Sequence, residues 1–220
     1  MKETAPAMRR LFWAFLFAAA FAFVEAAVVV YLRALYYPGG FAFPLRVLAT
    51  DHIAVELARE FSTLAMILAV ASITAVRSWE RFGFFIFIFG VWDIFFYLWL
   101  KVCINWPLTL FDWDILFLIP LPWIGPVIAP LLVALALTVC GTIIVLRLER
   151  STVIRLTVAS VALWLCGTAV ILYSFVCDTE ATLRGTMPLP YRYELLGIGL
   201  ALYIAAFVTL KTTKASPGAT

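Results

Sequence analysis

The fold class of this chain is decided by an apolar run close to its N-terminus, LFWAFLFAAAFAFVEAAVVVYL (residues 11–32). A helix of about 20 apolar residues is long enough to cross the hydrocarbon core of a bilayer. The run is longer than the apolar part of a signal peptide, and no small-residue cleavage site follows before Glu25. We therefore interpret residues 11–32 as a membrane span.

The composition of the whole chain agrees with a membrane protein. Of its 220 residues, 65% are hydrophobic and only 13% are charged, whereas soluble domains carry roughly 45–50% apolar and about 25% charged residues. These proportions exclude a soluble enzyme, a nucleic-acid-binding protein and a disordered regulator. The chain contains one histidine, no Cys-x-x-Cys pair and no glycine-rich phosphate-binding motif, so we expect neither haem nor a bound nucleotide.

Five further apolar stretches follow the first one. Together they predict an all-α, polytopic membrane bundle of about six transmembrane helices, forming a single transmembrane domain over residues 1–220. The expected spans are residues 11–32, 53–76, 82–102, 114–146, 153–176 and 195–210. Residues 1–10 and 211–220 are expected to be short cytoplasmic tails, of which the second is flexible.

The fourth stretch is unusual because prolines interrupt it. A straight helix over its length would measure about 50 Å, whereas the hydrocarbon core is about 30 Å thick. We predict a short initial segment, a break around residues 119–126 and a main helix from about residue 127, because proline disrupts helices. An interrupted segment can mark a transporter binding site, but a kinked packing helix or a helix that follows a loop is also consistent with it. The interrupting residues are Pro120, Pro122, Gly125, Pro126 and Pro130.

The basic residues predict the orientation of the bundle. If the N-terminus is cytoplasmic, the cytoplasmic side holds 10 of the 16 basic residues and 3 of the 13 acidic ones, a net charge of +7. The rest of the chain then holds 6 basic and 10 acidic residues, a net charge of −4. Because cytoplasmic loops carry an excess of Lys and Arg, we predict that both termini lie in the cytoplasm.

Ionisable residues gather in the outer half of this predicted bundle. His52, Glu56 and Glu60 follow one another at intervals of four residues, so they share one face of the second expected helix. Charged groups inside a membrane are costly and are functional candidates by default. We therefore predict an outward-facing, acidic polar pocket, with Glu25, Glu56, Arg59, Glu60, Asp93, Lys101 and Asp114 as its candidate residues.

Each candidate also has a purely structural interpretation. Residues 56–60 could lie on an amphipathic helix at the membrane surface. Lys101 could reach the lipid headgroups, and Asp114 could cap the initial segment of the fourth stretch. Glu25 and Asp93 have apolar neighbours on both sides, so each needs a partner or a proton, and a structural ion pair would supply one.

Two further hypotheses concern a metal and a disulfide. His52, Glu56 and Glu60 are weak candidates for metal ligands, because one imidazole and several carboxylates suit hard divalent cations. Cys103 and Cys177 both fall at outer ends of expected helices, where an oxidising compartment would allow a disulfide between them.

Three segments of the chain carry a resemblance to a known family. They read GVWDIFFY (residues 90–97), NWPLTL (105–110) and WDILFLIPLPWIGPVIAP (113–130). This pattern resembles a family of small bacterial proteins with six spans and no established activity. The resemblance implies a bacterial inner-membrane protein in contact with the lipid bilayer, and it implies no substrate or site residues.

Three functions are consistent with the sequence. Cation- or proton-coupled transport is favoured by the acids on one side and by the interrupted fourth segment. An intramembrane enzyme on a lipid-borne or periplasmic substrate could use two carboxyl groups as acid and base, or a metal. A structural or assembly subunit of a membrane complex would use the charges as ion pairs. A homo-oligomer or a membrane partner is compatible with all three, and no nucleic-acid partner is expected.

Overall fold

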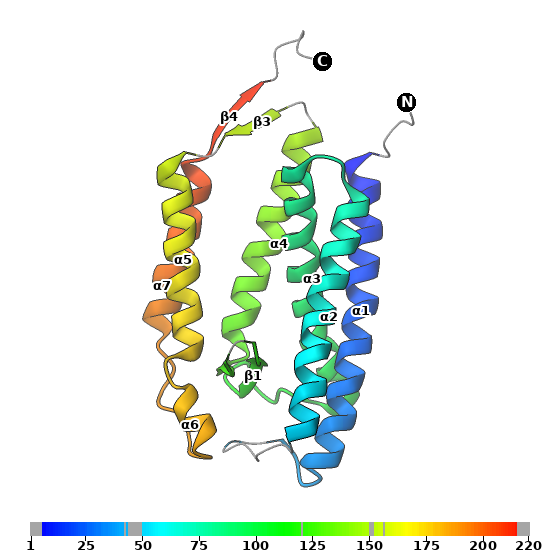
Figure 1. Cartoon of the computed structure of the whole chain (residues 1–220), viewed down its shortest axis with the longest axis vertical. Helices are drawn as coiled ribbons and strands as arrows, with labels where there is room; N and C mark the ends of the chain where they lie inside the picture. Colours follow the sequence, from blue (N-terminus) through cyan, green and yellow to red (C-terminus); the bar gives the residue numbers. More distant parts are fainter. Residues whose placement is uncertain are drawn as a thin grey trace.

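The fold is given by a computed structural model, which describes residues 6–41, 43, 50–119, 121–149, 152–155 and 157–214. Its helices are α1 (Ala7–Tyr36), α2 (Thr50–Thr74), α3 (Ser78–Ile104), α4 (Ile128–Glu149), α5 (Val158–Val176), α6 (Thr179–Leu183) and α7 (Tyr193–Val208). Its strands are β1 (Trp113–Phe117), β2 (Trp123–Pro126), β3 (Thr152–Arg155) and β4 (Lys211–Lys214). All helices except the short α6 run along the long axis and alternate in direction (Figure 1).

Four of these helices are long and apolar enough to cross a membrane. They are α1, α3, α4 and the segment Val158–Ala181, which begins with α5. The helix α7 is equally apolar in character but has 16 residues, and α2 carries charged residues in its first half. The chain is therefore a mostly helical, multi-pass membrane protein, as the composition predicts.

The prediction of a purely helical chain is wrong between α3 and α4. The stretch there forms an antiparallel hairpin, in which Asp114 of β1 lies opposite Gly125 of β2. Prolines and a glycine prevent a helix in this stretch, while its aromatic and β-branched residues favour strands. Asp114 therefore caps no helix. The main helix, α4, begins at Ile128, one residue after the predicted start.

The ends of the bundle also differ from the predictions. The fifth helix begins at Val158 and not at residue 153, because Thr157 and Ser160 form a capping box that starts α5. The residues before it form β3, which pairs antiparallel with β4. Residues 211–214 therefore belong to a strand and not to a flexible tail, while residues 215–220 lie outside the described part. At the other end of the chain, α1 begins at Ala7. Residues 7–10 of the expected N-terminal tail are therefore helical, and residues 1–5 lie outside the described part.

The helix α3 packs closely against α4 through glycines. A Cβ atom added at Gly90 would lie 2.4 Å from the carbonyl oxygen of Ala134, and one added at Gly141 would lie 2.5 Å from that of Gly83. Small residues at such positions let two helix backbones approach each other inside a membrane. The pair α5–α7 uses Gly167 and Gly199 in the same way.

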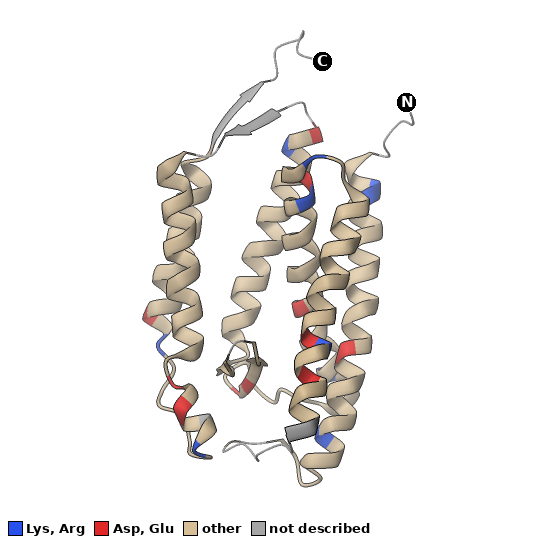
Figure 2. Cartoon of the chain, in the orientation of Figure 1, with Lys and Arg blue, Asp and Glu red and all other residues tan. Residues whose placement is uncertain are grey.

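Charged residues divide between the two ends of the bundle. Figure 2 shows Asp and Glu mostly in the half opposite the chain termini, whereas Lys and Arg lie at both ends. At the end that carries the termini, the basic end, Arg10 of α1 pairs with Glu80 of α3 at 2.6 Å. Between the two ends lies an apolar core that includes Ala18, Phe84 and Ile88. This apolar core separates the ion pair Arg10–Glu80 from the larger group of charged residues in the opposite half.

Candidate functional site

A small polar cavity lies where α1, α2, α3 and the β1–β2 hairpin meet. Its volume is about 70 Å³, which is enough for a few water molecules or a small hydrated ion. Apolar and aromatic side chains complete its wall. The ionisable residues that line it are Glu25, Arg33, Arg59, Glu60, Asp93, Tyr97 and Asp114.

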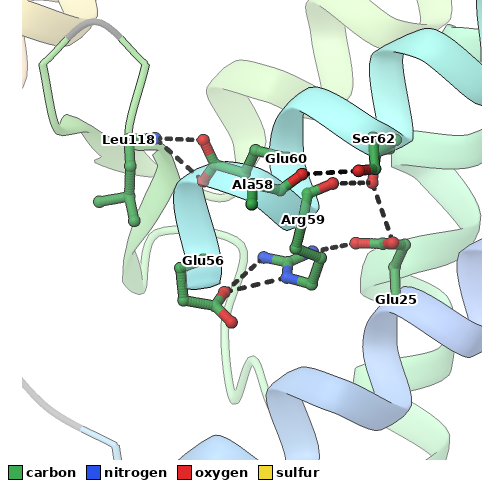
Figure 3. A network of polar contacts seen from close by, with 8 residues as sticks. Glu25, Glu56, Ala58, Arg59, Glu60, Ser62 and Leu118 are labelled. Carbon is green, nitrogen blue, oxygen red and sulfur yellow. Dashed lines mark hydrogen bonds and ion pairs between the residues drawn. The ribbon is translucent and has the colours of Figure 1, made fainter. Parts of the chain in front are cut away.

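Arg59 joins two acids from different helices (Figure 3). Its Nη1 forms an ion pair with Oε2 of Glu25, while its Nη2 and Nε donate to Oε2 of Glu56 at 2.7 Å and 3.0 Å. The hydroxyl of Thr63 donates to the other oxygen of Glu25 at 2.9 Å. Glu25 and Glu56 are only 4% and 7% exposed, so one arginine is shared between two almost fully buried carboxylates.

Glu60 connects α2 to the hairpin. Both of its carboxylate oxygens accept a hydrogen bond from the backbone N–H of Leu118, at 3.0 Å and 2.9 Å (Figure 3). Glu60 is 6% exposed, and within the described ranges it forms no salt bridge. The backbone N–H groups of Leu118 and Ile119 act on this carboxylate, which leaves part of its acceptor capacity unused.

Arg33 holds the hairpin against α1. Its Nη2 donates to Oδ1 of Asp114 at 2.9 Å, and the hydroxyl of Tyr97 also bonds to this carboxylate. The guanidinium carbon lies 3.7 Å from the ring centre of Trp106 and 4.1 Å from that of Phe41. The planar cation is thus stacked against two rings, while its buried Nη1 has no hydrogen-bond partner.

Asp93 is the acid without a partner. It lines the cavity from α3 and is half-buried. Among the residues that the structure describes, its carboxyl group forms neither a salt bridge nor a hydrogen bond. The charged group that acts on it, Asp114, has the same sign. A lone carboxylate in such surroundings needs a proton or a cation to be stable.

Most of the predicted site residues come together. Glu25, Arg59, Glu60, Asp93 and Asp114 line one cavity, and Glu56 is joined to them by Arg59.

Lys101 does not belong to this group. It lies two turns beyond Asp93 on α3, is exposed, and donates from Nζ to the carbonyl oxygen of Pro107 at 2.8 Å. Lys101 therefore stabilises the turn that follows α3. It does not add a third cation to the two arginines of the cavity, Arg33 and Arg59.

Next to this turn, Asp112 organises the loop before β1. Its carboxylate accepts from the backbone N–H of Leu108 at 2.7 Å and from the hydroxyl of Thr109 at 2.7 Å. Partial burial acts to raise the pKa of Asp112, but these hydrogen bonds and the charge of Lys101 together lower it below its usual value. Asp112 is therefore ionised at neutral pH and contributes to the shape of the loop.

The metal and disulfide hypotheses are not supported by the geometry. His52 contacts the hydroxyl of Tyr36 through Nδ1, whereas Glu56 and Glu60 turn to Arg59 and to Leu118. In the described part of the chain, no three His, Cys, Asp or Glu side chains are placed to hold a metal ion. Three potential ligands on one helix face therefore do not form a metal site here, because each side chain bonds to a different partner.

The two outer cysteines do not form a disulfide. Cys103 and Cys177 are both free and exposed. One ends α3 and the other follows α5, and these helices belong to separate parts of the bundle (Figure 1).

Sequence reasoning missed Arg33, Thr63 and Tyr97. Arg33 follows the first apolar run directly and lies eight residues after Glu25, which places both on one face of α1. That spacing was a usable signal. Tyr97 follows Asp93 by one helical turn, and Thr63 follows Arg59 by one helical turn, so the same kind of spacing could have indicated both.

Comparisons of the chain with protein-family models, with curated proteins and with solved structures found no match.

Proposed function

We propose that this protein spans a bacterial inner membrane six times and binds a proton or another small cation in its polar cavity, as part of cation- or proton-coupled transport. The observation that carries the proposal is the charge of the site. Two arginines stand against five acids, a net charge of −3 if all are ionised. The acids are Glu25, Glu56, Glu60, Asp93 and Asp114.

Such an excess of buried negative charge is unstable unless positive charge enters the site. The ion pairs engage Arg59 with Glu25 and Glu56, and Arg33 with Asp114. Glu60 and Asp93 form no ion pair with a described residue, and the cation that acts on Glu60 is Arg59, which is already bonded to two other acids. Because an uncompensated buried carboxylate is costly, protons or a small cation must share the cavity with them.

The six-span topology is supported by the alternating directions of α1, α2, α3, α4, α5 and α7 (Figure 1). With the basic end in the cytoplasm, both termini are cytoplasmic and the cavity lies in the outer half of the membrane. The resemblance of residues 90–130 to small bacterial six-span proteins agrees with this placement.

Transport of the bound cation across the membrane needs a conformational change in addition to binding. The apolar core formed by Ala18, Ile88 and their neighbours separates the cavity from the cytoplasmic end. A cation that enters from outside therefore reaches the other side only if α1–α3 rearrange or if another subunit supplies the path. Exchange of ion pairs around Arg59 is the natural trigger, since this arginine is the shared partner of two acids.

The enzyme hypothesis fits this cavity less well. Pockets that bind small organic substrates usually measure about 300–1,000 Å³, whereas this one measures about 70 Å³. Its size suits an ion and excludes a lipid headgroup. No observation specifically favours an assembly subunit.

Ion flux in reconstituted vesicles tests the proposal. The wild type, Asp93→Asn, Glu60→Gln and the control Glu180→Gln are compared. Glu180 pairs with Arg184 on the exposed surface of the α6 region and does not line the cavity. Proton flux is followed with a trapped pH dye and sodium flux with a radioactive tracer.

We expect the wild type and the control to pass one of the two ions faster than empty vesicles, and the two cavity variants to pass it no faster than empty vesicles. If folded wild-type protein conducts neither ion, or if the cavity variants conduct as well as the wild type, the proposal is wrong.

A further inference from the structure

A second cavity lies at the opposite end of the bundle and is apolar. It measures about 490 Å³ and lies between α3–α4 on one side and α5–α7 on the other. These two pairs of helices stand apart in Figure 1. Its walls include Trp79 from the start of α3, Ile144 from the end of α4 and Leu210 after α7. All three lie toward the basic end, so the cavity occupies the half of the membrane that the polar site leaves free.

Three hydroxyl groups in its wall are already bonded to each other or to backbone. The hydroxyls of Thr168 and Tyr203 are 2.9 Å apart, and the hydroxyl of Ser160 donates to the carbonyl oxygen of Thr157 at 2.9 Å. The remaining surface is mostly hydrocarbon and aromatic. This wall therefore favours an alkyl chain.

The volume matches a fatty-acyl chain. An apolar cavity of about 150 Å³ holds one benzene ring, and this cavity is about three times as large. By that ratio it has room for roughly 18 carbon atoms, the size of one chain of a membrane phospholipid.

A cation stands at the basic end of the cavity. The guanidinium carbon of Arg147 lies 5.3 Å from the ring centre of Phe207, which is part of the wall. Arg147 is exposed and forms no salt bridge with any described residue. Basic groups beside a cavity between helices on the cytoplasmic side are typical of binding sites for anionic lipid headgroups.

From the apolar wall, the volume and this cation together, we propose that the cavity binds one anionic phospholipid. One acyl chain lies between α3–α4 and α5–α7, and the headgroup phosphate is bound by Arg147. The lipid then fills the gap between two parts of the bundle that otherwise contact each other only sparsely. This site is separate from the polar cavity, and its test does not depend on ion transport.

The test is native mass spectrometry of the whole protein in mild detergent, titrated with phosphatidylglycerol or phosphatidylcholine. Ala136→Phe fills the cavity from α4, and Val161→Phe fills it from α5 in case the first variant does not fold. Ala201→Phe adds the same ring on an exposed position of α7 and serves as the control. Arg147→Gln removes the cation and keeps the cavity.

We expect one phosphatidylglycerol to remain bound to the wild type and to the Ala201→Phe control, and to be lost from the filled variants. Arg147→Gln is expected to bind phosphatidylglycerol about fivefold more weakly and phosphatidylcholine unchanged. The proposal is wrong if filling the cavity leaves lipid retention unchanged, if the wild type binds both lipids equally, or if the wild type appears as a dimer whose formation the filled variants abolish.

Discussion

Replacing Gly90 by alanine tests the packing that positions the site. The new Cβ would lie 2.4 Å from the carbonyl oxygen of Ala134 and 2.5 Å from the hydroxyl oxygen of Thr138, whereas ordinary contact begins at 3.4 Å. Because the first of these atoms is backbone, no rotamer change relieves the clash, and α3 must move from α4 by about 1 Å. Overpacking of this kind costs about 1–3 kcal/mol, and alanine returns about 1 kcal/mol of helix propensity. With the cost at the upper end, we expect a net loss of about 2 kcal/mol.

Gly197→Ala is the matched control, since a Cβ at Gly197 meets nothing within 4 Å. It should leave the free energy of unfolding unchanged or raise it by up to about 1 kcal/mol. Both variants are unfolded from mild detergent by sodium dodecyl sulfate, with tryptophan fluorescence as the readout. If Gly90→Ala proves as stable as Gly197→Ala, then α3 and α4 do not meet at Gly90 and the wall of the polar site is placed wrongly.

Of three further predictions, two concern side chains of the site and one concerns the orientation of the bundle. Arg33→Lys keeps the charge but loses stacking on two rings, so we expect unfolding to become easier by about 1–2 kcal/mol; unchanged stability would mean that the rings do not hold this cation. Thr63→Val removes the hydroxyl that bonds to a buried carboxylate and should cost about 1.5–3 kcal/mol. Ser72→Ala is its control, because Ser72 bonds only to a carbonyl of its own helix, and equal losses in both variants would contradict the reasoning. Finally, Cys103 as the sole cysteine should react with an impermeant maleimide on intact spheroplasts, and reaction only after permeabilisation would reverse the proposed orientation.

The positions of the helices could be read from the sequence because membrane spans must satisfy their backbone hydrogen bonds internally and need about 20 apolar residues. The start of α4 was predicted to within one residue because prolines before it exclude a helix. The gathering of acids in one half of the bundle followed from their positions within the predicted spans. The hairpin was missed because strands of four and five residues within an apolar run leave no period that distinguishes them from a short helix.

The sequence by itself thus determined that the chain is a membrane bundle, approximately where its helices begin and end, and in which half its charges lie. Only the tertiary structure decided which charges meet. Glu56 and Glu60 share a helix face but turn to different partners, and Asp114 finds Arg33 at a distance of 81 residues along the chain. These choices depend on how each helix is rotated about its axis and on where the hairpin folds back. Both are set by packing between distant segments, which local patterns of hydrophobicity and charge do not encode.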